Sequence, residues 1–169
     1  MTRTARRKKG RAVRFQRCIR ALATLPLLLL PCLSLPAWAS ERVALVIGNA
    51  AYAHAPRLAN PLNDAGDIGS ALERLGFAVT RLADADQVGM RRALQDFAKA
   101  AAASETALVF YAGHGIEVDK RNFLVPVDAR LVSDADVEFE AVPLALVQRA
   151  VERARGLRLV ILDACRENP

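Results

Sequence analysis

The sequence predicts an α/β fold in which a mostly parallel central sheet has helices on both faces. Two observations lead to this prediction. Short runs of apolar, β-branched residues alternate along the chain with longer segments whose apolar residues recur every three or four positions. The runs at 42–48 and 106–111 are almost wholly apolar, which is typical of strands covered on both sides. Strands that alternate with amphipathic helices form parallel sheets between two helix layers.

The first strand and the first helix lie within residues 42–76. The strand covers residues 42–48 and ends at Gly48. Asn60 is the expected N-cap of the helix, and Pro61 stands at the first helical position, where a missing N–H loses no helical hydrogen bond. Gly76 ends the helix, because glycine readily adopts the left-handed conformation found there. The apolar face of this helix consists of Leu62, Ala65, Ile68, Leu72 and Leu75.

The remaining elements repeat this alternation. A second strand covers residues 77–82, and Asp86 caps a second helix whose inner stripe is Met90, Leu94, Phe97 and Ala101. The third strand, residues 106–111, is apolar enough to be central, and segments 115–120 and 122–127 predict a hairpin beyond it. A third helix is expected from Pro143 to Arg155, closed by Gly156. Residues 157–162 are predicted to be a last, buried strand.

The first 39 residues account for the basic charge of the chain. They hold nine Lys or Arg and no acid, which leaves 15 basic against 18 acidic residues in the remainder. This acidic remainder argues against a nucleic-acid-binding surface. The basic stretch, a leucine-rich core and the small residues of Ala37-Trp38-Ala39 are typical of a signal peptide cleaved before Ser40. We therefore expect an exported protein, periplasmic or secreted.

An uncleaved inner-membrane anchor is the alternative interpretation of residues 1–39, and the unusually long basic stretch keeps it open. In that case the leader is the only expected contact with the membrane. Either way, residues 40–169 form one domain. Cys18 and Cys32 lie in the leader, so Cys165 is the only cysteine of this domain. It cannot form an internal disulfide or a cysteine metal site, and is either a buried apolar residue or a reactive group.

Two segments at predicted strand ends carry candidate chemistry. His114 lies between two glycines just after the third strand, and Cys165 follows the last strand. Because chemistry in parallel sheets lies beyond the carboxyl ends of the strands, a base and a nucleophile at these ends can converge on one substrate. The alternative is a turn with an incidental histidine. The other histidine, His54, lies in a polar loop and is expected to be solvated.

The amino-acid sequences of these two segments resemble motifs of the caspase and metacaspase superfamily. The motifs are Tyr111-Ala112-Gly113-His114-Gly115 and Asp163-Ala164-Cys165-Arg166. Caspases carry Gln-Ala-Cys followed by Arg, Gln or Gly and then Gly, with a histidine about 50 residues upstream. Here the histidine precedes the cysteine by 51 residues, with Asp163 in place of the glutamine and Glu167 in place of the glycine. The segments similar to bacterial caspase-family proteins are 43–49, 60–65, 75–77, 122–129 and 163–169.

The resemblance implies a three-layer caspase-haemoglobinase-like fold and a cysteine endopeptidase acting on protein or peptide substrates. Cys165 is then the nucleophile, and His114 protonates the leaving amine and activates water. The backbone amides of Gly115 and Cys165 form the oxyanion hole. Relatives continue through further strands after the cysteine, so we expect residues 40–169 to lack the C-terminal strands that complete the cleft. Activity of this stretch alone is accordingly not expected.

Specificity follows from the same resemblance. In metacaspases two acidic residues select Arg or Lys before the cleaved bond. Asp163 matches one of them and Asp64 the other, with Asp67 as the alternative to Asp64. The competing explanations are local amide capping for Asp163 and the favourable helix dipole for Asp64.

The resemblance implies no cofactor other than a response to calcium, which many metacaspases show. An acidic stretch precedes the third helix, and its spacing lacks the glycine and terminal glutamate of an EF-hand loop. It is expected to be a solvated loop, and its residues are Asp128, Asp134, Asp136, Glu138 and Glu140. The sequence predicts no metal site and assigns no oligomeric state.

Two other functions compete with the peptidase. The first is a catalytically silent caspase-like interaction or regulatory module, which the presence of both His114 and Cys165 disfavours. The second is a small-molecule-binding α/β domain. That function requires a glycine-rich phosphate loop after the first strand, and Gly48-Asn49-Ala50-Ala51-Tyr52 is not one.

Overall fold

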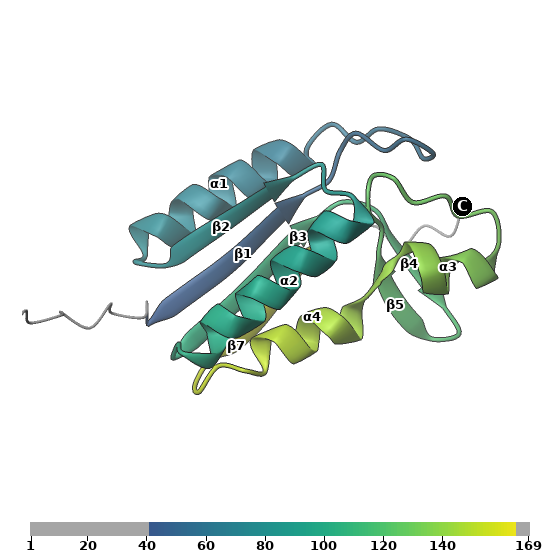
Figure 1. Ribbon diagram of the computed structural model, residues 1–169. Helices are drawn as coiled ribbons and strands as arrows, with labels where there is room; N and C mark the ends of the chain where they lie inside the picture. The colour runs from purple at the N-terminus through teal and green to yellow at the C-terminus, as the bar shows by residue number, and fades with distance from the viewer. Residues whose placement is uncertain (1–40, 165–169) are drawn as a thin grey trace, which may run out of the picture. The chain divides into compact units, whose positions relative to one another are not determined.

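Four parallel strands form the central sheet of residues 41–164, the part of the chain that the computed structural model describes (Figure 1). Their spatial order is β2-β1-β3-β7. The strands are β1 (Arg42–Gly48), β2 (Ala78–Ala83), β3 (Thr106–Ala112) and β7 (Arg158–Asp163). Helix α1 (Pro61–Arg74) packs on one face, and α2 (Gln87–Ala102) and α4 (Leu144–Val151) pack on the other. The predicted α/β class with a mostly parallel sheet and two helix layers is confirmed.

The strand order creates a switch point between β1 and β3. The chain leaves β1 toward α1 on one face, whereas the connection after β3 leads to α4 on the opposite face. Gly48, Ala112 and Asp163 are aligned in neighbouring strands, so β1, β3 and β7 end at one level. Connections that diverge to opposite faces leave a crevice at the carboxyl ends, where ligands bind in open α/β sheets.

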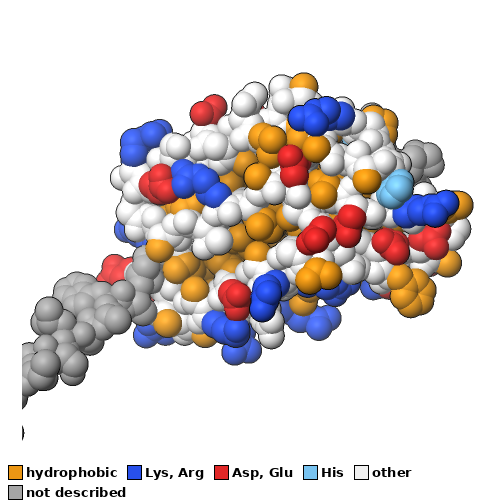
Figure 2. All heavy atoms as spheres, turned by 45° about the horizontal axis from the view of Figure 1, so that its top comes forward, with side chains coloured by type: hydrophobic (Ala, Val, Ile, Leu, Met, Phe, Trp, Pro, Cys, Tyr) orange, Lys and Arg blue, Asp and Glu red, His pale blue; other side chains and the backbone are white. Residues whose placement is uncertain are grey.

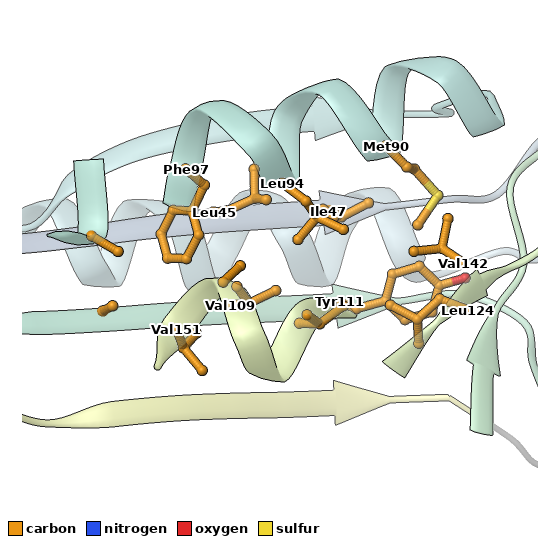
Figure 3. Close-up of a cluster of buried hydrophobic side chains, with 14 of the residues drawn as sticks. Leu45, Ile47, Met90, Leu94, Phe97, Val109, Tyr111, Leu124, Val142 and Val151 are labelled. Atoms are coloured by element: carbon orange, nitrogen blue, oxygen red, sulfur yellow. The ribbon is translucent and has the colours of Figure 1, made fainter. Parts of the chain in front are cut away.

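Two apolar layers hold the helices against the sheet. Under α1, Ala65 and Leu72 pack on alternate residues of β1 and β3 such as Val46 and Phe110. On the other face, side chains of α2 and α4 meet the remaining residues of the same strands (Figure 3). The fully buried members of this second layer are Leu45, Ile47, Met90, Ala101, Ala107, Val109, Tyr111, Val142 and Val147. Both faces of β1 and β3 are thus covered, as their unbroken apolar sequences predict.

The helix ends follow the local sequence signals. The Asp86 carboxylate accepts a hydrogen bond from the Gly89 N–H over 2.7 Å, which confirms the predicted cap of α2. Gly76 has a φ of 81°, as expected for the residue that terminates α1. Asn60 occupies the N-cap of α1, but its backbone is already helical and its side chain makes no capping bond.

A second, antiparallel sheet follows β3 and includes the predicted hairpin, β4 (Gly115–Val118) and β5 (Arg121–Leu124). Its third strand, β6 (Val142–Pro143), takes the place of the expected start of the third helix. Pro143 is extended, with ψ at 133°, because it pairs with Phe123 of β5. Helix α4 therefore begins one residue later, and it ends at Val151 rather than Arg155.

Two further expectations are wrong. Four of the five acidic residues expected in a solvated loop lie in a short helix, α3 (Asp134–Glu140), because Ser133 and Asp136 form a capping box at its start. The last strand, β7, is not buried. It lies at the edge of the sheet, and Ile161 and Leu162 are 43% and 42% exposed.

The leader predicted at residues 1–39 lies outside the described residues. Among residues 41–164, no helix combines the length and the apolar character that a membrane span requires.

Candidate active site

An open pocket of about 300 Å³ lies at the carboxyl ends of the strands. Its lining residues are Leu58, Ala59, Asn60, Pro61, Asp64, Ala112, Gly113, His114 and Asp163. They come from the β1–α1 loop, the start of α1 and the ends of β3 and β7, which is the switch point of the sheet. Figure 2 turns the α1 side forward and shows acidic side chains gathered at one end of that face, beside a histidine.

Asp64 and Asp163 reach this pocket from different elements. Asp64 is in the first turn of α1. Asp163 ends β7 and has the same parity as Leu159, which packs in the layer under α1, so both acids lie on one side of the sheet. Within residues 41–164, neither carboxylate accepts a hydrogen bond or pairs with a cation. The amides of residues 165 and 166, which Asp163 was considered to cap, lie outside the described residues, and Asp67 does not line the pocket.

The close approach of α1 to β1 depends on Gly48. A Cβ atom at this position would lie 2.6 Å from the Pro61 carbonyl oxygen and 2.9 Å from the Ala65 Cβ. Glycine therefore lets the first turn of α1, and with it Asp64, approach the end of the sheet.

The backbone of His114 is held by two tyrosine hydroxyls. Its N–H donates to Tyr52 Oη over 2.8 Å, and its carbonyl accepts from Tyr111 Oη over 2.7 Å and from the Val125 N–H over 3.1 Å. Gly113 makes room for this arrangement, because a Cβ atom there would lie 2.5 Å from Tyr52 Oη and 2.7 Å from Tyr111 Oη.

The imidazole of His114 is fixed by the same loop that lines the pocket. Its Nε2 lies 2.8 Å from the Pro56 carbonyl oxygen, and its ring centroid lies 4.5 Å from that of Tyr52 at an interplanar angle of 54°. A carbonyl only accepts hydrogen bonds, so Nε2 carries the proton and Nδ1 has a free lone pair in the neutral ring. The imidazole is half-buried.

Both tyrosines remain neutral donors near neutral pH. Burial is the main cause that raises the pKa of Tyr52, and burial raises the pKa of Tyr111 well above the usual value. The Tyr111 ring lies in the core beside Leu124 and Val142 (Figure 3). Its hydroxyl reaches the carbonyls of His114 and Val125 at the end of that core.

Two polar side chains hold the start of the β1–α1 loop, residues 49–60. Asn49 is fully buried, accepts from the Ala85 N–H over 2.9 Å and donates to the Val125 carbonyl over 3.2 Å. The Asp84 carboxylate accepts from the N–H groups of Ala50 and Ala51 over 2.7 and 2.9 Å. The loop that carries Tyr52 and Pro56 is therefore tied to its neighbours before it reaches His114.

The predicted site residues are described to different extents. His114, Asp163 and Asp64 line one pocket, whereas Cys165 lies outside the described residues. Gly115 begins β4 opposite Leu124. Since the adjacent Val125 N–H donates to the His114 carbonyl, alternation makes Gly115 and Leu124 a non-hydrogen-bonded pair, and the Gly115 N–H points away from β5.

The role of the Pro56 carbonyl was not foreseen, because a backbone group leaves no signal in the sequence. His54 is an exposed residue of the same loop, as expected, and does not line the pocket. Across residues 41–164, no three His, Cys, Asp or Glu side chains are grouped so as to hold a metal ion.

Comparison with known proteins places this architecture in a family. The family model described as the caspase domain matches residues 41–169. Over 133 residues the chain is 34% identical to human mucosa-associated lymphoid tissue lymphoma translocation protein 1 and 33% identical to its mouse homolog. Each match covers 76% of this chain, which spans 15% of the length of either relative.

A solved structure supports the fold. The protein GSU0716 of Geobacter sulfurreducens superposes with a TM-score of 0.57 at 23% identity, covering 74% of this chain and 50% of that one. The sequence match, the ordered motifs and the shared fold agree with one another. The chain belongs to the caspase-domain family of cysteine peptidases.

Proposed function

We propose that this domain is a cysteine endopeptidase in which Cys165 is the nucleophile and His114 the general acid and base. The observation that carries the proposal is the contact of His114 Nε2 with the Pro56 carbonyl oxygen. It leaves Nδ1 free to exchange protons beside a pocket with two carboxylates that have no partner among the described residues. In the sequence, Cys165 closely follows a residue that lines this pocket. Cys165 follows Asp163 by two positions, and two residues extend by at most about 7 Å.

The reaction has two steps. In the first, the thiolate sulfur attacks the scissile carbonyl carbon, the C–N bond breaks, and Nδ1 of the His114 imidazolium gives its proton to the leaving amine. In the second, Nδ1 accepts a proton from water while the water oxygen attacks the thioester and the C–S bond breaks, which releases the acid product and restores the thiolate and the imidazolium. The N–H of Gly115, directed away from β5, and that of Cys165 stabilise the oxyanion, and one such donor contributes about 100-fold or more in rate.

The substrate proposed is a protein or peptide with Arg or Lys before the cleaved bond. Asp64 and Asp163 place two carboxylates in one pocket, and neither pairs with a cation of residues 41–164. A guanidinium offers donors to both, while an acidic side chain would be repelled. Each hydrogen bond to a charged group contributes about 1.5–3 kcal/mol, so two of them account for a preference of several orders of magnitude.

Alkylation of the full-length protein tests the dyad. Iodoacetamide and a peptidyl-arginine chloromethylketone are expected to modify Cys165, as followed by peptide mass mapping. His114→Ala should slow both reactions at least about 10-fold, because the thiolate loses its partner. His54→Ala is the matched control, since His54 lies in the same region but outside the pocket. A folded protein whose Cys165 reacts no faster with His114 than without it would overturn the peptidase and favour a silent interaction module.

We also propose that residues 1–39 direct export to the periplasm or beyond. The support is their composition, with a basic start, an apolar core and small residues before Ser40. N-terminal sequencing of the exported protein should begin at Ser40. An intact leader on a membrane-bound protein would instead establish anchoring.

A further inference from the structure

We propose that Tyr52 is the positioning residue of the base, setting the orientation of His114 through its hydroxyl and its ring. The inference rests on the proposed peptidase function. Tyr52 contacts His114 twice: Oη accepts the backbone N–H over 2.8 Å, and the phenol ring lies 4.5 Å from the imidazole. Among the described residues, no other side chain contacts both the backbone and the ring of this histidine.

The hydroxyl groups of Tyr52 and Tyr111 can form a chain of hydrogen bonds that runs from Tyr52 to Tyr111 and on to a backbone carbonyl. Tyr111 donates its single hydrogen to a carbonyl, with the His114 oxygen nearest at 2.7 Å. Tyr52 Oη lies 3.4 Å from Tyr111 Oη and accepts from His114, so its own hydrogen is free to point to Tyr111. The N–H and the carbonyl of His114 are therefore both hydrogen-bonded to this pair of tyrosine hydroxyls.

The contact with Tyr52 replaces a hydrogen bond of the hairpin. In a regular antiparallel ladder, opposite residues exchange two N–H to carbonyl bonds. His114 and Val125 keep one of them, from the Val125 N–H to the His114 carbonyl over 3.1 Å. The other is absent, because the His114 N–H donates to Tyr52, while the Val125 carbonyl accepts from Asn49 and lies 3.1 Å from the Tyr111 hydroxyl. Tyr52 thus holds His114 out of the ladder, at the rim of the pocket.

Residues 49–60 consequently contact the imidazole of His114 at two places. The Tyr52 ring packs against it, and the Pro56 carbonyl binds its Nε2. Removing the hydroxyl of Tyr52 leaves the His114 N–H without this acceptor and loosens the position of Nδ1. The carboxylates of Asp64 and Asp163 make no hydrogen bond to Tyr52, so substrate binding should change little. A misplacement of about 1 Å in a catalytic group can cost about 100-fold in rate.

Kinetics of the full-length protein, with the C-terminal strands expected after the cysteine, test this role with a peptidyl-arginyl-amide substrate. Tyr52→Phe is expected to lower kcat about 10-fold and Tyr52→Leu about 100-fold, with KM within about 2-fold of wild type. Tyr111→Phe is the matched control, because the Val125 N–H still binds the His114 carbonyl. It should lower kcat less than Tyr52→Phe while lowering the urea midpoint more, since Tyr111 is fully buried. An unchanged kcat in Tyr52→Phe would overturn the proposal.

A second measurement does not depend on turnover. In the full chain carrying Cys165→Ala, amide hydrogen exchange of His114 should be at least about 10-fold faster in Tyr52→Phe, with exchange at Val125 unchanged. The backbone amide of His114 is simple to assign by residue type, because His54 is the only other histidine. If the full-length wild type shows no turnover, the peptidase proposal fails. The amide exchange rate of His114 then tests by itself whether Tyr52 holds this backbone. Unchanged exchange at His114 would rule out the positioning contact even in an active enzyme.

Discussion

Asp64 and Asp163 lie 99 residues apart in the sequence and line the same pocket as His114. Asp64 is half-buried in the first turn of α1, and Asp163 is exposed at the end of β7. These two carboxylates come from separate elements, neither pairs with a cation among the described residues, and together they are the proposed binding site for a basic side chain of the substrate.

Neutralising either acid should weaken the selection of basic substrates. We expect Asp64→Asn and Asp163→Asn each to lower kcat/KM for an arginyl substrate about 10- to 100-fold, because each removes one charge-assisted contact. Asp67→Asn is the control, since Asp67 is exposed and outside the pocket, and it should stay within about 2-fold. Equal losses in all three variants would show that overall charge, rather than the pocket, governs the rate.

Replacing Gly48 by alanine should destabilise the domain. The new Cβ would meet the Pro61 carbonyl at 2.6 Å, and because this atom belongs to the backbone the helix start must shift. Such overpacking costs about 1–3 kcal/mol in the free energy of unfolding, as measured by urea denaturation. Gly66→Ala is the matched control inside α1. No atom lies within 4 Å of its added Cβ, so the variant should gain about 0.5–1 kcal/mol. A neutral Gly48→Ala would contradict the close approach.

Variants of Asp84 should separate hydrogen bonding from backbone strain. Asp84 has a φ of 46°, and its carboxylate accepts from two amides of the 49–60 loop. Asp84→Ala loses the acceptor and keeps the left-handed conformation, so we expect a loss of about 2–4 kcal/mol. Asp84→Gly should be about 1 kcal/mol better than Asp84→Ala, and Asp84→Asn better than both. An alanine variant as stable as the asparagine variant would show that the carboxylate contributes nothing to the loop.

Stability above pH 10 should depend on the two buried phenols. Burial raises the pKa of Tyr111 well above its usual value and raises that of Tyr52, so the unfolded chain loses these protons first. Their contribution is complete below about pH 10 and is lost as the pH rises through the folded values, by at most about 1.4 kcal/mol per pH unit and group. Urea midpoints measured from pH 8 to 12 should fall less steeply in Tyr111→Phe than in the wild type. Urea midpoints that fall equally steeply with pH in Tyr111→Phe and in the wild type would contradict the raised pKa of Tyr111.

Local patterns predicted most of the sheet and the helix ends. The apolar run of residues 42–48 coincides with β1. Asp86 lies at a helix start, where its carboxylate caps an N–H, and Gly76 lies just after a helix, where its backbone can be left-handed. These features could be predicted because each depends on a few neighbouring residues. Helix α3 was not predicted, because its acidic composition is equally typical of a loop and outweighed the signal of the capping box at Ser133 and Asp136. The edge position of β7 depends on its neighbours in space, which an apolar strand sequence does not specify.

The sequence by itself determined the family, the fold class and the identity of His114, Asp64 and Asp163 as candidates, because motifs at strand ends are local and ordered. Only the tertiary structure showed which atoms meet His114. The Pro56 carbonyl and the Tyr52 hydroxyl belong to a loop about 60 residues earlier in the chain, and a loop reaches its partners through packing of distant segments. Backbone carbonyls are the same at every residue, so the orientation of the His114 imidazole is decided by the fold.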